Sequence, residues 1–164
     1  MRTLRRQQPR HRPLFEFVAV STHCRSSTPP RLQRYRGDNY GDTGGVTLGT
    51  NDLARAAGFY DAIATELGVG RMMDTERFIA WGTPGGGAGI GLTRPFDGKP
   101  ATVGNGVMVA FEARDKAQVD RIHRLALSLG GKDEGAPGPR GDQGFYAAYF
   151  RDLDGNKQNA FVMG

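Results

Sequence analysis

The chain has 164 residues, of which 38% are hydrophobic and 24% charged, as expected for one globular domain with a real core. No apolar run approaches the roughly 18–20 residues that a membrane helix needs, so a membrane protein is not expected. The formal net charge of +5 is unevenly spread: residues 1–43 hold nine arginines and three acidic residues, which makes them +6 and leaves residues 44–164 at −1. The basic balance therefore carries no information about the partners of residues 44–164.

Residues 1–43 have the composition of an extension without its own core, because they are rich in Arg, Pro, Ser and Gln. A disordered tail, an Arg-rich arm for nucleic acid or a membrane surface, a targeting peptide and a misassigned start codon all fit this composition. The arginines form no helical stripe, so we do not expect nucleic-acid binding and favour a dispensable extension. Cys24 is the one cysteine and permits no intramolecular disulfide, which is consistent with a cytoplasmic protein.

Residues 44–95 predict a strand, a helix and further strands. The segment 45–50 is rich in β-forming residues and ends at Asn51 and Asp52, which are good helix N-caps. Apolar residues then recur at helical spacing over 53–67, and Gly68 follows as a C-cap. Short strand signals come next at 77–81 and 88–93, with a glycine turn at 85–87 between them.

The same plan recurs over residues 104–164. A strand at 106–111 precedes a helix that Asp115 caps and that ends near Gly130, and a turn-rich stretch at 135–144 leads to strands at 145–150 and 157–163. The sequence therefore predicts an internal repeat and an α+β fold.

Three segments resemble the vicinal-oxygen-chelate superfamily of glyoxalases, bleomycin-resistance proteins and extradiol dioxygenases. They are the opening strand and helix start at 46–61, the strand at 104–111 and the hairpin at 149–157, where Leu153 replaces the usual proline. The stretch 92–102 resembles an uncharacterised bacterial subgroup. The resemblance implies two βαβββ modules, at about 44–95 and 104–164, with a curved mixed sheet around a pocket. It also implies a homodimer, since such domains often pair their modules across chains.

The superfamily holds a metal ion with His, Glu or Gln at four strand positions. By resemblance these positions fall at Gly45, Gly91, Met108 and Asn159. Glycine offers no side-chain donor, methionine is a soft thioether and asparagine offers one neutral oxygen, so we expect neither a metal nor another cofactor. The residues themselves agree, because 44–164 contain one histidine, His123, no cysteine and no HxH, HExxH or CxxC motif. We expect His123 to be a surface or edge residue of its helix.

A pocket can remain after the ligands are lost. Alternation along strands places Thr47 on the face of Gly45, and Thr93 on the face of Gly91. With an aromatic residue, a loop arginine and the residue that matches a pocket tyrosine of fosfomycin-resistance relatives, the predicted ligand-binding residues are Thr47, Trp81, Thr93, Arg94, Met108, Tyr149 and Asn159. Plain core packing of these side chains stays open as the alternative.

Three hypotheses for function follow. The first is a metal-free domain that binds a small molecule. The second is a metal-dependent lyase or dioxygenase with a relocated site, and its sign would be Glu112, His123 or Asp97 converging in space. The third is a domain that binds a partner protein. No catalytic residue is assigned, and any enzymatic class is implied by the resemblance alone.

Overall fold

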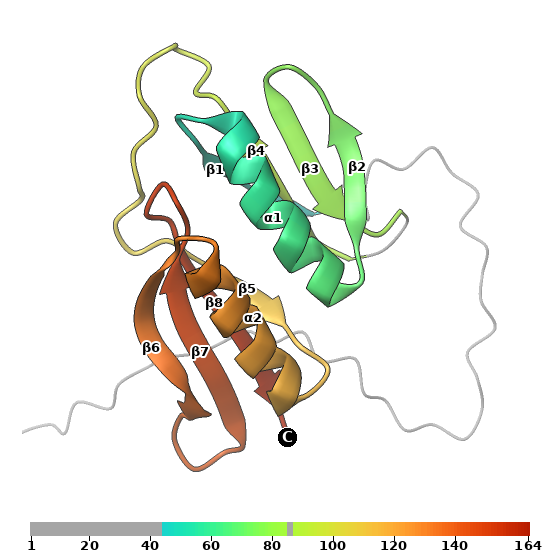
Figure 1. Ribbon diagram of the computed structural model, residues 1–164, viewed down its shortest axis with the longest axis vertical. Coiled ribbons are helices and arrows are strands. Elements are labelled where there is room, and N and C mark those ends of the chain that lie inside the picture. Colours follow the sequence, from blue (N-terminus) through green and yellow to red (C-terminus); the bar gives the residue numbers. More distant parts are fainter. Residues whose placement is uncertain (1–43, 85–86) are drawn as a thin grey trace, which may run out of the picture. The chain divides into compact units, whose positions relative to one another are not determined.

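The computed structural model describes residues 44–84 and 87–164, so the predictions for 1–43 and for the turn at 85–86 lie outside the described residues. The described part has ten elements in two successive modules (Figure 1). Module 1 comprises β1 (Gly45–Gly49), α1 (Leu53–Leu67), β2 (Gly70–Asp74), β3 (Phe78–Gly82) and β4 (Gly89–Thr93). Module 2 comprises β5 (Met108–Glu112), α2 (Lys116–Ser128), β6 (Lys132–Pro139), β7 (Phe145–Arg151) and β8 (Lys157–Met163).

Each module forms its own four-stranded mixed sheet. The strand orders are β1-β4-β3-β2 and β5-β8-β7-β6, so the two modules have the same topology. In each sheet the first and last strands pair in parallel, and the other neighbours pair antiparallel. A parallel pair needs a crossover connection, which the helix provides. The predicted α+β fold of two βαβββ modules is confirmed.

Both helices begin and end at the signals in the sequence. The Asp52 carboxylate accepts the backbone N–H of Arg55 at 3.0 Å, and Gly68 ends α1 with φ of 78°, a left-handed conformation that suits glycine. The Asp115 carboxylate accepts the N–H of Gln118 at 2.7 Å at the start of α2. These local caps explain why the helix positions were predictable.

Two strands differ from the sequence-based expectation. No strand was expected at β2, and β6 occupies part of the stretch that was predicted to be turn-rich. All five residues of β2 are exposed, so it has no alternating pattern to detect. Strand β6 carries two glycines and two prolines; it lies at a sheet edge and its register against β7 shifts twice, where such residues are tolerated.

The two modules share a core between their helices. Helices α1 and α2 pack side by side (Figure 1), and Phe59 of α1 lies 6.4 Å from Phe150 of β7 between ring centroids. Tyr60 stacks at an angle on Phe59 and Trp81, with centroids 5.5 and 5.7 Å away. None of the described helices has the length and hydrophobicity that crossing a membrane requires.

A buried polar network joins the turn between β7 and β8 to module 1. The Tyr60 hydroxyl donates to the Asp152 carboxylate at 2.8 Å and accepts from Gln158 Nε2 at 2.9 Å. The Asp154 carboxylate accepts from the Thr50 hydroxyl at 2.6 Å. Burial, and then the nearby Asp152 charge, raises the pKa of Tyr60 well above its ordinary value. The network therefore fixes module 2 on module 1 through neutral Tyr60.

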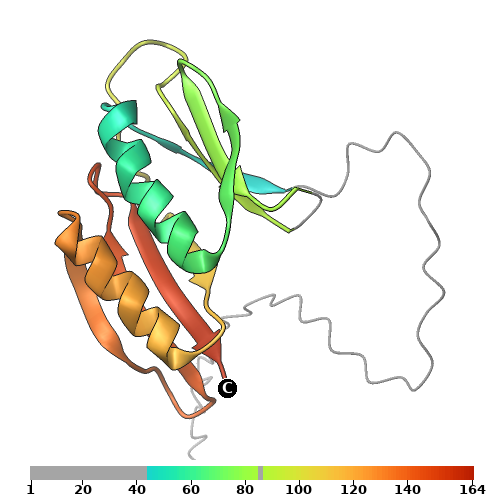
Figure 2. The ribbon, with the colours of Figure 1, turned by 45° about the vertical axis from the view of Figure 1, so that its right-hand side comes forward.

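Each helix covers one face of its own sheet, and the other face is not covered by any described element (Figure 2). Residues alternate accordingly: Leu48 and Phe111 are buried toward the helices, whereas Thr47 and Met108 are exposed on the other face. We call these uncovered faces the module 1 face and the module 2 face. They carry the strand positions at which the sequence predicts a site.

Candidate functional site

The module 1 face is closed at its centre by an aromatic ring. Thr47 pairs with Gly91, and Phe78 pairs with Thr93 on the neighbouring strand. A Cβ atom at Gly91 would lie 2.7 Å from Cζ of Phe78, so the Phe78 ring occupies the space that a side chain at Gly91 would need. The Thr93 hydroxyl donates a hydrogen bond to the Arg77 carbonyl oxygen at 3.2 Å, so its proton is already used within the protein. This face offers few free polar groups to a ligand.

The module 2 face has a buried amide at its centre. Asn159 of β8 lies between Ala110 of β5 and Tyr149 of β7 in the strand register. Its side chain is almost completely buried, at 2% exposure, and its Oδ1 has no hydrogen-bond partner among the described residues. A buried polar atom left unpaired costs about 1–3 kcal/mol, so this amide is costly unless another molecule satisfies it.

Cations surround Tyr149 on the same face. The Arg140 guanidinium lies 5.5 Å from the Tyr149 ring centroid, and the Lys157 ammonium lies 5.6 Å from it. Lys157 and Arg151 share the Glu134 carboxylate, at 3.2 and 2.7 Å. Arg151 first, and Lys157 second, hold the pKa of Glu134 below its usual value. The carboxylate is therefore ionised at neutral pH and neutralises one of the cations.

The four family metal positions are related by the repeat. In module 1, Gly45 lies two residues before Thr47, which pairs with Gly91. In module 2, Met108 lies two residues before Ala110, which pairs with Asn159. This diagonal arrangement on neighbouring parallel strands is the same in both modules and supports the assignment of these positions.

The side chains at the four positions do not fit the metal that the family implies. Two of the positions supply no donor, and the Phe78 ring fills the space beside Gly91. The remaining donors are the thioether of Met108 and the amide of Asn159, on one module, which is not a ligand set for Mn, Fe, Ni or Zn. We therefore derive no chemistry through a metal at this position.

A relocated metal site has no support in the geometry. His123 is buried on α2, and its Nε2 lies 3.0 Å from Asp133 Oδ1, so the prediction of a surface or edge residue is wrong. The Gly135 N–H and then His123 lower the pKa of Asp133. Asp97 accepts the Lys99 N–H in its own turn, and Glu112 stands at the exposed end of β5. Within 44–84 and 87–164, no group of three or more His, Cys, Asp or Glu is placed to hold an ion.

Five of the predicted ligand-binding residues lie on the two uncovered faces. Thr47 and Thr93 are on the module 1 face, and Met108, Tyr149 and Asn159 are on the module 2 face. Within one chain the structure thus brings together the three residues of the module 2 face, but it does not bring them together with the two threonines of the module 1 face. The orphaned amide makes the module 2 face the candidate site.

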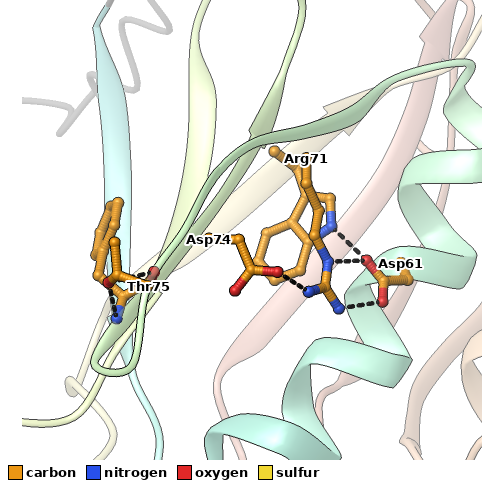
Figure 3. A network of polar contacts seen from close by, with 6 residues as sticks. Asp61, Arg71, Asp74 and Thr75 are labelled. Atoms are coloured by element: carbon orange, nitrogen blue, oxygen red, sulfur yellow. Dashed lines mark hydrogen bonds and ion pairs between the residues drawn. The ribbon is translucent and has the colours of Figure 1, made fainter.

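Trp81 and Arg94 lie elsewhere. Trp81 points to the helix side of β3, where it is buried and donates to the Asp61 carboxylate at 2.8 Å. Arg71 donates to both oxygens of Asp61, at 2.8 and 2.6 Å, and contacts Asp74 (Figure 3). Arg71 is also the main cause of the lowered pKa of Asp61. This network ties β2 and β3 to α1, whereas Arg94 is exposed beyond the end of β4.

A cavity of about 670 Å³ lies between β1, β5 and α1. It is lined mainly by aliphatic and aromatic side chains, and Glu112 is the one charged residue lining it in the part of the chain that the structure describes. Trp81 and Gly45 line this cavity, but Tyr149 and Asn159 do not. We place the candidate site on the module 2 face because Asn159 Oδ1 lies there. Gln158 Oε1, the other buried side-chain oxygen without a partner among the described residues, lies in the core, and we consider the cavity an apolar gap between two sheet edges.

Two residues of these faces were missed from the sequence. The alternation of side chains along β3 could have placed Phe78 on the module 1 face. Phe78 lies three residues from Trp81, so a Trp81 that points to the helix puts Phe78 on the opposite face. No local pattern indicates Arg140, since its position depends on how the chain turns between β6 and β7 and on contacts across that hairpin.

The topology and the repeated diagonal of strand positions define a glyoxalase-like domain. The family model of the Glyoxalase/Bleomycin resistance protein/Dioxygenase superfamily matches residues 44–158, and the chain belongs to this superfamily. No match is found among curated protein sequences.

Solved structures agree with this assignment. A glyoxalase/bleomycin resistance protein from Albidiferax ferrireducens T118 is 36% identical, with a TM-score of 0.68 over 74% of this chain and 98% of its own. A family enzyme from Burkholderia phytofirmans PsJN is 20% identical, with a TM-score of 0.62 over 76% of this chain and 100% of its own. A lactoylglutathione lyase from Agrobacterium tumefaciens is 22% identical, with a TM-score of 0.53 over 73% of this chain and 91% of its own. The last two support the fold alone.

Proposed function

We propose that this chain is a metal-independent member of the superfamily that binds a small molecule on the module 2 face. The observation that carries the proposal is the Asn159 amide, which is 2% exposed and has an Oδ1 without a partner among the described residues. A ligand that donates a hydrogen bond there would remove the cost of burying this atom. Tyr149 and Phe161 beside it supply the flat apolar surface that small-molecule sites commonly use.

The donor set supports binding without a metal. Glycine at two of the four family positions, and Phe78 over one of them, leave an ion without its usual ligands. The site is therefore better suited to an organic ligand than to an ion.

We extend the proposal to a homodimer. Strands β1 and β5 are edge strands, and both line the apolar cavity beside α1. Val107 and Met108 at the start of β5 are 50% and 38% exposed. Open strand edges with apolar side chains are surfaces that association covers, and pairing of modules across chains is what family membership leads us to expect.

The test is a screen of small aromatic compounds by thermal shift on the full chain, with and without a chelator such as EDTA. We expect some compounds to raise the melting temperature by the same amount in both conditions, because no ion takes part. The Asn159→Leu variant, which removes the amide but keeps the apolar surface, should lose the shift. Stabilisation that disappears with EDTA would overturn the proposal, and so would a screen without any stabilising compound.

A further inference from the structure

The positive charge around Tyr149 identifies the class of ligand. We propose that the module 2 face binds a small organic oxyanion, a carboxylate or a phosphate, held by Arg140 and Lys157 beside the Tyr149 ring. This inference rests on the proposed function and adds to it the ligand class and two binding residues.

Arg140 is held against the sheet with most of its donors free. Its Nη2 donates to the Ala136 carbonyl oxygen at 2.7 Å, which anchors one end of the guanidinium. A Cβ at Gly135 would lie 3.4 Å from Nη2 of Arg140 and 3.2 Å from Cδ2 of Tyr149, so the glycine leaves the room in which guanidinium and ring meet. In the described part of the chain no carboxylate lies within 4.0 Å of this guanidinium. Its remaining N–H groups form a fork that suits an oxyanion.

Charge on this face is not balanced. Lys157 and Arg151 both pair with Glu134, whereas Arg140 pairs with no carboxylate of the described residues, so three cations at this end of the face are matched by one paired carboxylate. The other carboxylate on the face, Glu112, pairs in register with Phe161 and stands at the opposite end from Lys157. The end of the face near Tyr149 and Lys157 is therefore the end that attracts an anion.

The order of side chains along β8 gives the shape of the ligand. Lys157, Asn159 and Phe161 follow one another on the same face at steps of about 6.5–7 Å, the rise of two strand residues. Phe161 extends the apolar end with Phe145, whose ring centroid lies 5.6 Å away. A matching ligand has an oxyanion at one end, a short chain past the Asn159 amide and an apolar or aromatic group at the other end.

The experiment is isothermal titration calorimetry on the full chain with 3-phenylpropionate, 2-phenylethyl phosphate and the neutral 3-phenylpropanamide. We expect at least one of the two anions to bind roughly tenfold or more tightly than the amide, the size of one charge-assisted hydrogen bond. The anion that binds more tightly then identifies the oxyanion. Arg140→Gln should weaken that anion by a similar factor and leave the amide unchanged. Arg124→Gln, which removes one exposed charge from α2, is the matched control and should have no effect.

Equal affinity for the anions and the amide, or an Arg140→Gln variant that binds the anion like the parent chain, would overturn the inference. In both cases a ligand has bound the chain, and the proposed function then stands only if Asn159→Leu abolishes that binding. If none of the three probes binds, the inference fails, and the chelator-independent screen of aromatic compounds decides the proposed function separately.

Discussion

At the scale of single residues, the Asn159 amide is the feature that packing does not explain. The neighbouring positions on its own strand, Gln158 and Ala160, belong to the core. Gln158 donates to Tyr60, although its Oε1 also lacks a partner among the described residues, and Ala160 is fully buried. Asn159 faces the other way and makes no contribution of that kind. Residues that a fold tolerates at a cost are commonly residues that function requires.

Replacing Asn159 should therefore raise stability while removing ligand binding. Asn159→Leu removes the unpaired oxygen, and we expect the free energy of unfolding to rise by about 1–2 kcal/mol. Urea denaturation measures the change. Asn156→Leu is the matched control and should destabilise the chain, because the Asn156 amide donates to Asp152 at 2.8 Å. Destabilisation of similar size by both substitutions would show that Asn159 is an ordinary structural residue.

Tyr60 should contribute to stability through both of its hydrogen bonds. Tyr60→Phe removes one hydrogen bond from Asp152, which keeps those from Asn156, and leaves Gln158 Nε2 without a partner among the described residues. We therefore expect a loss of about 1–3 kcal/mol at neutral pH. Tyr146→Phe, whose hydroxyl donates to Asp120 on a half-exposed surface, should cost less. Equal losses would contradict the role of the buried network.

The raised pKa of Tyr60 also predicts how the stability of the fold changes with pH. Because the folded-state pKa of Tyr60 is raised, its contribution is complete below the unfolded value of about 10 and is lost as pH rises toward the folded value. Stability of the parent chain should fall above pH 10, and Tyr60→Phe should show a smaller fall in denaturation curves recorded at several pH values.

At the scale of elements, the predictable parts of the fold are those with local signals. Helix α1 has an Asp52 cap, one apolar stripe and a Gly68 terminator, and these suffice to place it. Strand β2 has none of this, since it exists only through pairing with β3 and through the link from Arg71 to α1. Strand β6 contains turn-forming residues that a sheet edge accepts. Tertiary pairing overrides local preference in both strands.

The Asp61 network should give an acid dependence to the packing of β2 and β3. The lowered pKa of Asp61 means that its contribution is present above the unfolded value of about 4 and is lost as pH falls through the folded value. Asp61→Asn should lower the free energy of unfolding by a few tenths to about 1 kcal/mol at pH 7, because the pair with Arg71 is partly exposed. The variant should also lose less stability than the parent chain as the pH falls, so the acid limb of its curve of stability against pH should be shallower. Glu76→Gln, at an exposed position outside the network, is the control. An unchanged acid limb in Asp61→Asn would contradict this assignment.

At the scale of the whole molecule, the site was predictable in part. Matching the strands to the family assigns the metal positions to Gly45, Gly91, Met108 and Asn159. This assignment stays a prediction, and the strand register relates the four positions in the same way in both modules. Trp81 was placed in the pocket, yet it lies under α1, since aromatic character alone does not tell which face of a strand is buried. The position of Arg140 over Tyr149 depends on contacts across a hairpin, which no sequence pattern expresses.

The open edges of β1 and β5 predict self-association. Sedimentation equilibrium of the full chain at micromolar concentrations should give twice the mass of 17.8 kDa. Met108→Lys at the β5 edge should weaken the dimer by placing a charge among apolar groups. Met73→Lys is the matched control, because this exposed methionine lies on the edge strand at the other side of its sheet. A parent chain that is monomeric, or equal weakening by both variants, would contradict the proposed dimer.

The central claim, that this domain works without the metal of its family, is tested most directly by metal stoichiometry. The full chain is treated with chelator, offered Mn²⁺, Fe²⁺, Ni²⁺ and Zn²⁺ separately, freed of unbound ion and assayed for metal per chain by mass spectrometry. The side chains at the four family positions predict far less than one equivalent of each ion. One tightly bound metal per chain, lost on substitution of Met108 or Asn159, would contradict the account.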